Sequence, residues 1–172
     1  MHKLVFECET ITPMFLAGAD GKTPELRAPS IKGALRFWWR AMNGHKSIEK
    51  LKIEEANIFG GTEAGQGKSK VIIRAKGTFK SVKEKLHKHN VDVYINKIKK
   101  NIPINILEYL AYGTLDYIKN QGNVFNRDYI PVNTNFTMMF QYEMNIEEDL
   151  LNSIKFMLLF GGLGSRSRNG FG

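Results

Sequence analysis

Residues 161 to 172 read GGLGSRSRNGFG and follow a segment with the apolar spacing of a helix. The five glycines of this stretch permit positive φ angles, and they let a ligand approach the backbone because no Cβ stands in the way. Its backbone N–H groups can converge on an anion, and Arg166 and Arg168 add guanidinium groups whose geometry suits phosphate. We therefore predict a phosphate-binding loop that includes Gly162, Gly164 and Ser165. A structural turn is the alternative, since the loop follows the negative, C-terminal end of a helix dipole.

Three segments ahead of this loop have the pattern of strands. Apolar and polar side chains alternate in residues 3 to 11 and, strictly, in residues 135 to 143. Residues 70 to 76 contain the run Val71-Ile72-Ile73, which is typical of a buried strand. The sequence therefore predicts three strands that are far apart along the chain.

Helical spacing of apolar residues connects these strands. We expect helices at residues 31 to 42 and 146 to 160, with Ser30 and Asn145 as their N-caps. Residues 47 to 59 form a further helical segment with Ser47 as its N-cap. Between them, residues 77 to 134 are predicted to form a lysine-rich, partly helical insertion.

The order of these elements predicts an α+β fold. Strand, helix, strand, strand, helix and glycine loop match the ferredoxin-like (RRM-like) βαββαβ pattern without its last strand. The length of 172 residues suits one domain, residues 1 to 172, better than two. The fourth strand would follow Gly172, and its absence would expose main-chain groups at the sheet edge. We therefore expect a truncated or split chain whose final strand comes from elsewhere.

Composition favours a polyanionic partner. The net charge is +8 and the pI is near 9.5, which points to nucleic acid first. Cys8 is the only cysteine, which excludes an internal disulfide and a cysteine-based zinc cluster. The longest apolar run, residues 156 to 160, is too short to span a membrane. We expect a cytoplasmic protein with no membrane partner, no metal and no cofactor.

The helix at residues 31 to 42 carries a basic stripe. Lys32, Arg36 and Arg40 recur at intervals of four, so they lie on one side of the helix, and Trp39 falls among them. Such a stripe is better tolerated beside an anion, and an interleaved tryptophan offers a flat surface for a base. The alternative is that Trp39 packs against the neighbouring loop and that the arginines pair with Glu25 or Glu54. The core face is predicted at a separate set of apolar positions: Ile31, Ala34, Leu35, Trp38 and Met42.

Two stretches carry a resemblance to a known family. Residues 18 to 20 (GAD) and 24 to 41 (PELRAPSIKGALRFWWRA) resemble the signature of the first Cmr subunit, a family of RAMP proteins in type III-B CRISPR effector complexes. Residues 161 to 172 resemble the glycine-rich loop of the RAMP superfamily. The first motif is long and specific, whereas the loop alone indicates only RAMP. Members of this family usually carry two ferredoxin-like domains, and this chain matches the first.

This resemblance implies a non-catalytic RNA-binding subunit that acts in antiviral defence. Its partners would be CRISPR guide RNA, target RNA and the other Cmr subunits. The implied RNA-binding positions are Lys32, Arg36, Trp39 and Arg40 of the helix and Arg166 and Arg168 of the loop.

An endoribonuclease that acts on CRISPR RNA or target RNA is the alternative. RAMP nucleases that process repeats use a general-base histidine, for which His45 is the candidate here. Target-cleaving subunits place an aspartate between the first strand and the first helix, where this chain has Asp20. Asp20-Gly21 is also an ordinary turn dipeptide, so the residue types do not decide between the two roles.

Overall fold

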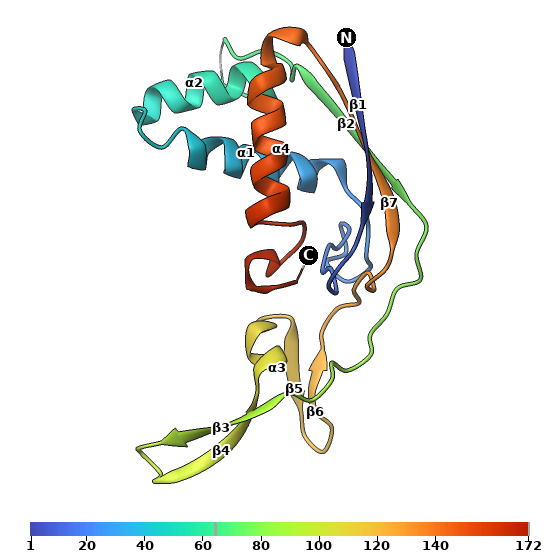
Figure 1. The fold of residues 1–172 in the computed structure, drawn as a ribbon, viewed down its shortest axis with the longest axis vertical. Coiled ribbons are helices and arrows are strands. Elements are labelled where there is room, and N and C mark those ends of the chain that lie inside the picture. The colour runs from blue at the N-terminus through green and yellow to red at the C-terminus, as the bar shows by residue number, and fades with distance from the viewer. Residues whose placement is uncertain (64, 172) are drawn as a thin grey trace.

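The computed structural model describes every residue except Ala64 and Gly172. Its centre is a three-stranded antiparallel sheet with the order β1-β7-β2, formed by His2–Glu9, Asn135–Tyr142 and Val71–Gly77. The predicted strands are therefore present, and the strictly alternating one, β7, lies in the middle (Figure 1). This position explains its alternation, since the side chains of one face are buried and those of the other are only partly covered.

Helices cover one face of this sheet. Helix α1 (Ala28–Met42) and helix α2 (Ile48–Phe59) lie between β1 and β2 in sequence, and α4 (Glu147–Phe160) follows β7 after the short 3₁₀ turn η1 (Met144–Ile146). Figure 1 shows α1 crossing behind α4 on the same side of the sheet. The core between the layers includes Ile31 and Leu35 of α1, Met138 and Phe140 of β7 and Leu150 of α4. No helix in the described part of the chain is long and apolar enough to cross a membrane.

Two of the three predicted helix caps are wrong. Helix α1 begins at Ala28 rather than after Ser30, because Pro29 suits the first turn, where its missing N–H needs no partner. Helix α4 begins after Ile146, because η1 already occupies the position predicted for the Asn145 cap. The Ser47 cap of α2 is confirmed, and its hydroxyl accepts a hydrogen bond from the N–H of Lys50 at 3.4 Å.

The insertion is mostly β structure rather than helix. It contains two antiparallel hairpins, β3 (Asn90–Ile95) with β4 (Lys100–Asn105) and β5 (Leu115–Ile118) with β6 (Gly122–Phe125). Between them lies only one short helix, α3 (Ile106–Leu110). The sequence does contain the strand signal, since apolar residues alternate at Val91, Val93 and Ile95 in β3 and at Ile102 and Ile104 in β4.

A second, smaller apolar cluster joins the insertion to the body. Phe15, from the segment after β1, contacts Phe125 and Tyr129 of the insertion and Phe171 of the glycine-rich loop, with ring centroids 5.1 to 5.5 Å apart. All of these side chains are buried. The start and the end of the chain therefore meet at Phe15, and this contact positions the loop.

Two glycines provide opposite tests of this fold. Gly164 has a φ of +99°, and a Cβ there would lie 2.8 Å from the carbonyl oxygen of Phe15. We expect Gly164→Ala to lower the free energy of unfolding by about 2 kcal/mol, because both strain and a backbone clash oppose it. Gly33 lies in α1 with open space around it. Gly33→Ala should therefore raise the free energy of unfolding by about 0.5–1 kcal/mol.

Urea unfolding of the two variants measures both effects on the same protein. Equal destabilisation by the two alanines would show that the loop does not approach Phe15 as closely as described.

Candidate RNA-binding site

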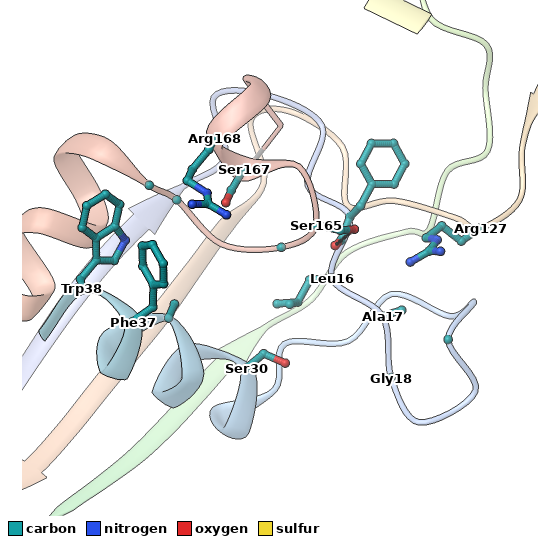
Figure 2. A pocket seen from close by; sticks show the side chains of 16 residues that line it. Leu16, Ala17, Gly18, Ser30, Phe37, Trp38, Arg127, Ser165, Ser167 and Arg168 are labelled. Carbon is teal, nitrogen blue, oxygen red and sulfur yellow. Dashed lines mark hydrogen bonds between the residues drawn. The ribbon is translucent and has the colours of Figure 1, made fainter. Parts of the chain in front are cut away.

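A cavity of about 490 Å³ lies where the glycine-rich loop meets α1. Three segments line it: the α1 face with Ser30 and Trp38, the segment from Phe15 to Gly18, and the loop itself. Arg127, from the insertion, completes the lining. The fold thus brings the loop and α1, both singled out in the sequence, to one hollow (Figure 2).

Backbone contacts fix the loop beside the segment after β1. The N–H of Ser165 donates to the carbonyl oxygen of Phe15 at 2.8 Å, and the Ser165 hydroxyl donates to the same oxygen at 3.1 Å. On either side of Ser165, Leu163 is buried in the main core and Phe171 in the smaller cluster. With both flanks anchored, the residues between them are held at the rim of the cavity.

The charged side chains that line the cavity are both basic. Arg127 and Arg168 line it, and its lining contains no carboxylate. In the part of the chain that the structure describes, neither arginine forms an ion pair; Arg127 donates only to the neutral amide oxygen of Asn126 at 3.1 Å. Figure 2 shows Arg168 on the side of Phe37 and Arg127 on the side of Gly18, with Ser165 between them. Two unpaired guanidinium groups that face one hollow suit a phosphate-bearing ligand.

Aromatic rings form the wall next to Arg168. The guanidinium carbon of Arg168 lies 4.9 Å from the centre of the Phe37 ring, a cation–π contact. Phe37 in turn meets Trp38 edge to face, and Trp38 lies against Phe156 and Phe160 of α4. Phe37, which lines the cavity, is exposed, so the wall offers apolar ring surface there.

The basic stripe of α1 faces a different direction. Arg36 and Arg40 both donate to Oε1 of Glu55, a buried carboxylate of α2, and the Arg40 contact is 2.7 Å long. The predicted pairing with Glu25 or Glu54 is therefore wrong in its partner. The two arginine side chains remain 38% and 46% exposed, respectively. Burial, and then the neighbouring Arg36 charge, lower the pKa of Lys32.

The predicted base-stacking role of Trp39 is wrong. Trp39 is 1% exposed, and its indole N–H donates to Oδ1 of Asp149 in α4 at 2.9 Å. The buried stripe of α1 is Ile31, Leu35 and Trp39, spaced by four, so Trp38 takes the half-buried position at the cavity instead. Because the two tryptophans are adjacent, the sequence pattern assigned Trp38 to the core and Trp39 to the ligand, and the structure shows the reverse.

The structure therefore divides the predicted site residues. Four of them line the cavity: Gly162, Gly164, Ser165 and Arg168. Five do not: Lys32, Arg36, Trp39, Arg40 and Arg166. Arg166 instead places its guanidinium group 5.8 Å from the centre of the Tyr112 ring, toward the insertion. Two residues of the cavity were not predicted from the sequence. Arg127 lies in the insertion, where no pattern pointed to it. Phe37 could have been found, because its position next to the two tryptophans is a signal.

The two residues considered for cleavage lie outside this cavity. Oδ1 of Asp20 accepts hydrogen bonds from the N–H groups of Lys22 and Thr23, both at 2.9 Å, and Oδ2 accepts from the Thr23 hydroxyl. These hydrogen bonds lower the pKa of Asp20 to about 2. The carboxylate thus closes its own turn. His45 is exposed beyond the end of α1. Among the described residues, no group of three or more His, Cys, Asp or Glu side chains is arranged to hold a metal ion.

The family model of the RAMP superfamily matches residues 7–172. The chain belongs to the RAMP superfamily. This RAMP protein is also 31% identical, over its whole length and 94% of the relative's, to the CRISPR system Cmr subunit Cmr1-2 of Pyrococcus furiosus. It is 44% identical over 62 residues to Cmr subunit Cmr1-1 of the same organism, a match that covers 34% of this chain and 18% of the relative. The sequence-based resemblance to the first Cmr subunit is confirmed.

Solved structures share the fold of this RAMP protein. The crystal structure of Cmr1 from Pyrococcus furiosus in its apo form matches 98% of the chain with a TM-score of 0.60 and 24% identity. The chain spans 47% of that structure. A type III-B Cmr-beta complex bound to cognate target RNA contains a subunit that matches with a TM-score of 0.56 and 16% identity over 98% of this chain and 56% of that subunit. A type IV-B CRISPR complex gives the same TM-score at 13% identity, over 99% of this chain and 87% of its own.

The bond between Trp39 and Asp149 gives a test of the corrected assignment. A hydrogen bond to a charged group contributes about 1.5–3 kcal/mol, so Trp39→Phe should lower the free energy of unfolding by that order. In a double-mutant cycle with Asp149→Ala, we expect a coupling energy of at least about 1 kcal/mol. A coupling energy near zero would mean that the two side chains do not interact in solution.

Proposed function

We propose that this chain is a non-catalytic RNA-binding subunit of a type III-B Cmr effector complex and that the cavity between the loop and α1 holds an RNA backbone. Arg127 and Arg168, which form no ion pair with any residue that the structure describes and lie at opposite sides of the cavity, carry this proposal. A lining that combines two guanidinium groups with glycine backbone and lacks carboxylates favours phosphate over a neutral ligand. The Cmr-beta structure bound to target RNA supports the same kind of ligand.

The remaining basic residues have secondary roles in this proposal. Lys32, Arg36 and Arg40 lie on another side of α1, where Arg36 and Lys52 line a second cavity of about 410 Å³ together with Glu55. Because Glu55 already compensates part of the charge of Arg36 and Arg40, these two residues contribute less to RNA binding than Arg168. Arg166 contributes to RNA binding from the side of the insertion, where its guanidinium group lies over the Tyr112 ring.

Partners and architecture follow from the same proposal. The RNA ligands would be CRISPR guide RNA and target RNA, the protein partners the other Cmr subunits, and the setting antiviral defence in the cytoplasm. Residues 1 to 172 would form one ferredoxin-like domain. Among the described residues β1 and β2 each pair with β7 alone, which leaves both edges of the sheet open, and in the proposed ferredoxin-like arrangement the fourth strand would pair with β1.

Salt dependence of RNA binding tests the phosphate contacts. We expect Arg168→Ala and Arg127→Ala each to weaken binding of a single-stranded oligoribonucleotide regardless of its sequence. Each should reduce the slope of log K against log salt by about one unit. Fluorescence anisotropy at several salt concentrations measures both quantities.

Matched arginines serve as controls. Arg74 is exposed on β2, on the sheet face away from the helices, and Arg74→Ala should leave the slope within experimental error. Arg40→Ala should reduce it less than Arg168→Ala. If Arg40→Ala has the larger effect, the RNA follows the basic stripe of α1 instead of the cavity, and the proposed site is wrong.

A nuclease assay tests the non-catalytic part of the proposal. With labelled single-stranded RNA, we expect no specific cleavage with Mg²⁺ or with EDTA, because Asp20 closes its own turn and His45 lies outside the cavity. Specific cleavage that disappears in Asp20→Ala or in His45→Ala would instead support the endoribonuclease alternative.

A further inference from the structure

The hairpin β3–β4 has one apolar face. Residues directly opposite one another in a hairpin share a face, and here Val91 pairs with Ile104, Val93 with Ile102, and Ile95 with Lys100. Five of these six side chains are aliphatic and β-branched. The opposite face carries polar groups, a proline and the one aromatic ring of the two strands: Asn90, Asp92, Tyr94, Asn101, Pro103 and Asn105. The hairpin is therefore amphipathic across its two faces.

This apolar face has no partner within the described part of the chain. Figure 1 shows the hairpin projecting from the body, well away from the three-stranded sheet and α1. None of the five aliphatic side chains belongs to either hydrophobic cluster. Val91, Val93 and Ile102 are 44%, 41% and 36% exposed, although valine and isoleucine at a structured position are usually buried. A two-stranded hairpin is marginal alone, so a contiguous apolar face of this kind marks an interaction surface.

The chemistry of the face selects a protein rather than RNA. RNA bases stack on aromatic rings, but Tyr94, the aromatic residue of the hairpin, lies on the other face. Addition of a further strand along the β4 edge is disfavoured, since Pro103 removes a backbone donor from that strand. Binding through the face is the mode that the exposed aliphatic side chains favour, because it buries them.

Charge around the face specifies the partner further. Lys97, Lys99 and Lys100 surround the turn at the tip, and Lys88 precedes the base of β3. All four are exposed, and Asp92 on the opposite face is the one acidic residue between them in sequence. An aliphatic patch with a basic rim complements an apolar surface with an acidic rim, and it repels a second copy of itself.

We propose that the aliphatic face of the β3–β4 hairpin docks onto another protein subunit, on an apolar surface bordered by acidic residues. Val93 and Ile102 form the centre of this contact, and the lysines at the tip form its rim. The identity of the subunit rests on the proposed function, which supplies the other Cmr subunits as partners. The docking surface itself is separate from the RNA-binding cavity.

Site-specific crosslinking identifies what covers the face. The photoreactive residue p-benzoylphenylalanine replaces Val93 in the full chain, which is then reconstituted with the other Cmr subunits from the same source and with guide RNA. We expect a crosslink to one of those subunits, at a position flanked by aspartate or glutamate. The same probe in place of Asn101, on the opposite face, should give at most a tenth of that yield.

Two substitutions test the energetic contribution. Val93→Lys and Ile102→Lys should each weaken incorporation of the chain into the complex at least tenfold, whereas Asn101→Lys, which adds the same charge to the other face, should change it less than twofold. RNA binding by the isolated chain should be the same in all three. Circular dichroism and thermal unfolding confirm that the variants fold, since the hairpin contributes to neither core.

Each other outcome overturns the proposal. A crosslink from position 93 to RNA would make the hairpin a nucleic-acid contact, and one to a second copy of this chain would make it a self-association surface. Equal incorporation of Val93→Lys and Asn101→Lys would show that the aliphatic face is not buried. Loss of RNA binding by Arg168→Ala without any change in docking separates the two proposals. RNA binding at the cavity can be refuted while docking of the hairpin is confirmed, and docking can be refuted while RNA binding is confirmed.

Discussion

One backbone contact organises the candidate site: the N–H of Ser165 bonded to the carbonyl oxygen of Phe15 at 2.8 Å. It joins the last loop of the chain to the segment that leaves the first strand. Gly164 lies next to it, in a conformation and at a distance that exclude a side chain. Because Leu163 and Phe171 anchor the loop on either side, this contact determines where Ser167 and Arg168 stand relative to α1. The primary role of the glycines is thus to let the loop pack, and any role in ligand binding is secondary.

The loop is therefore both a structural turn and a candidate binding element. Several of its N–H groups are already bonded within the protein: those of Gly161 and Gly162 to Met157, and that of Ser165 to Phe15. A loop with these donors occupied cannot form the complete ring of free N–H groups of a nucleotide-binding loop. Affinity for phosphate then depends chiefly on the guanidinium groups of Arg127 and Arg168, which form no ion pair among the described residues.

How far the sequence predicts this structure depends on how local the determining interactions are. Strands β1, β2 and β7 and the helices follow from periodicity, because each buries one face against the same core. The sequence pattern reverses the assignments of Trp38 and Trp39 because the direction of α1 relative to α4 depends on a distant partner, Asp149. Arg127 was missed for the same reason. It reaches the cavity only because Phe15 binds the insertion to the loop, and no local pattern records that contact.

The most direct test of the RNA-binding account is an NMR titration of the ¹⁵N-labelled chain with a short single-stranded oligoribonucleotide. The account predicts the largest amide shifts at Gly162, Ser165 and Arg168 and at the α1 positions Ser30 and Trp38, all of which line one cavity. Guanidinium Nε–H signals of Arg127 and Arg168 should move with them. Shifts concentrated instead at Arg36, Lys52 and Gly61, which line the second cavity, would contradict the account.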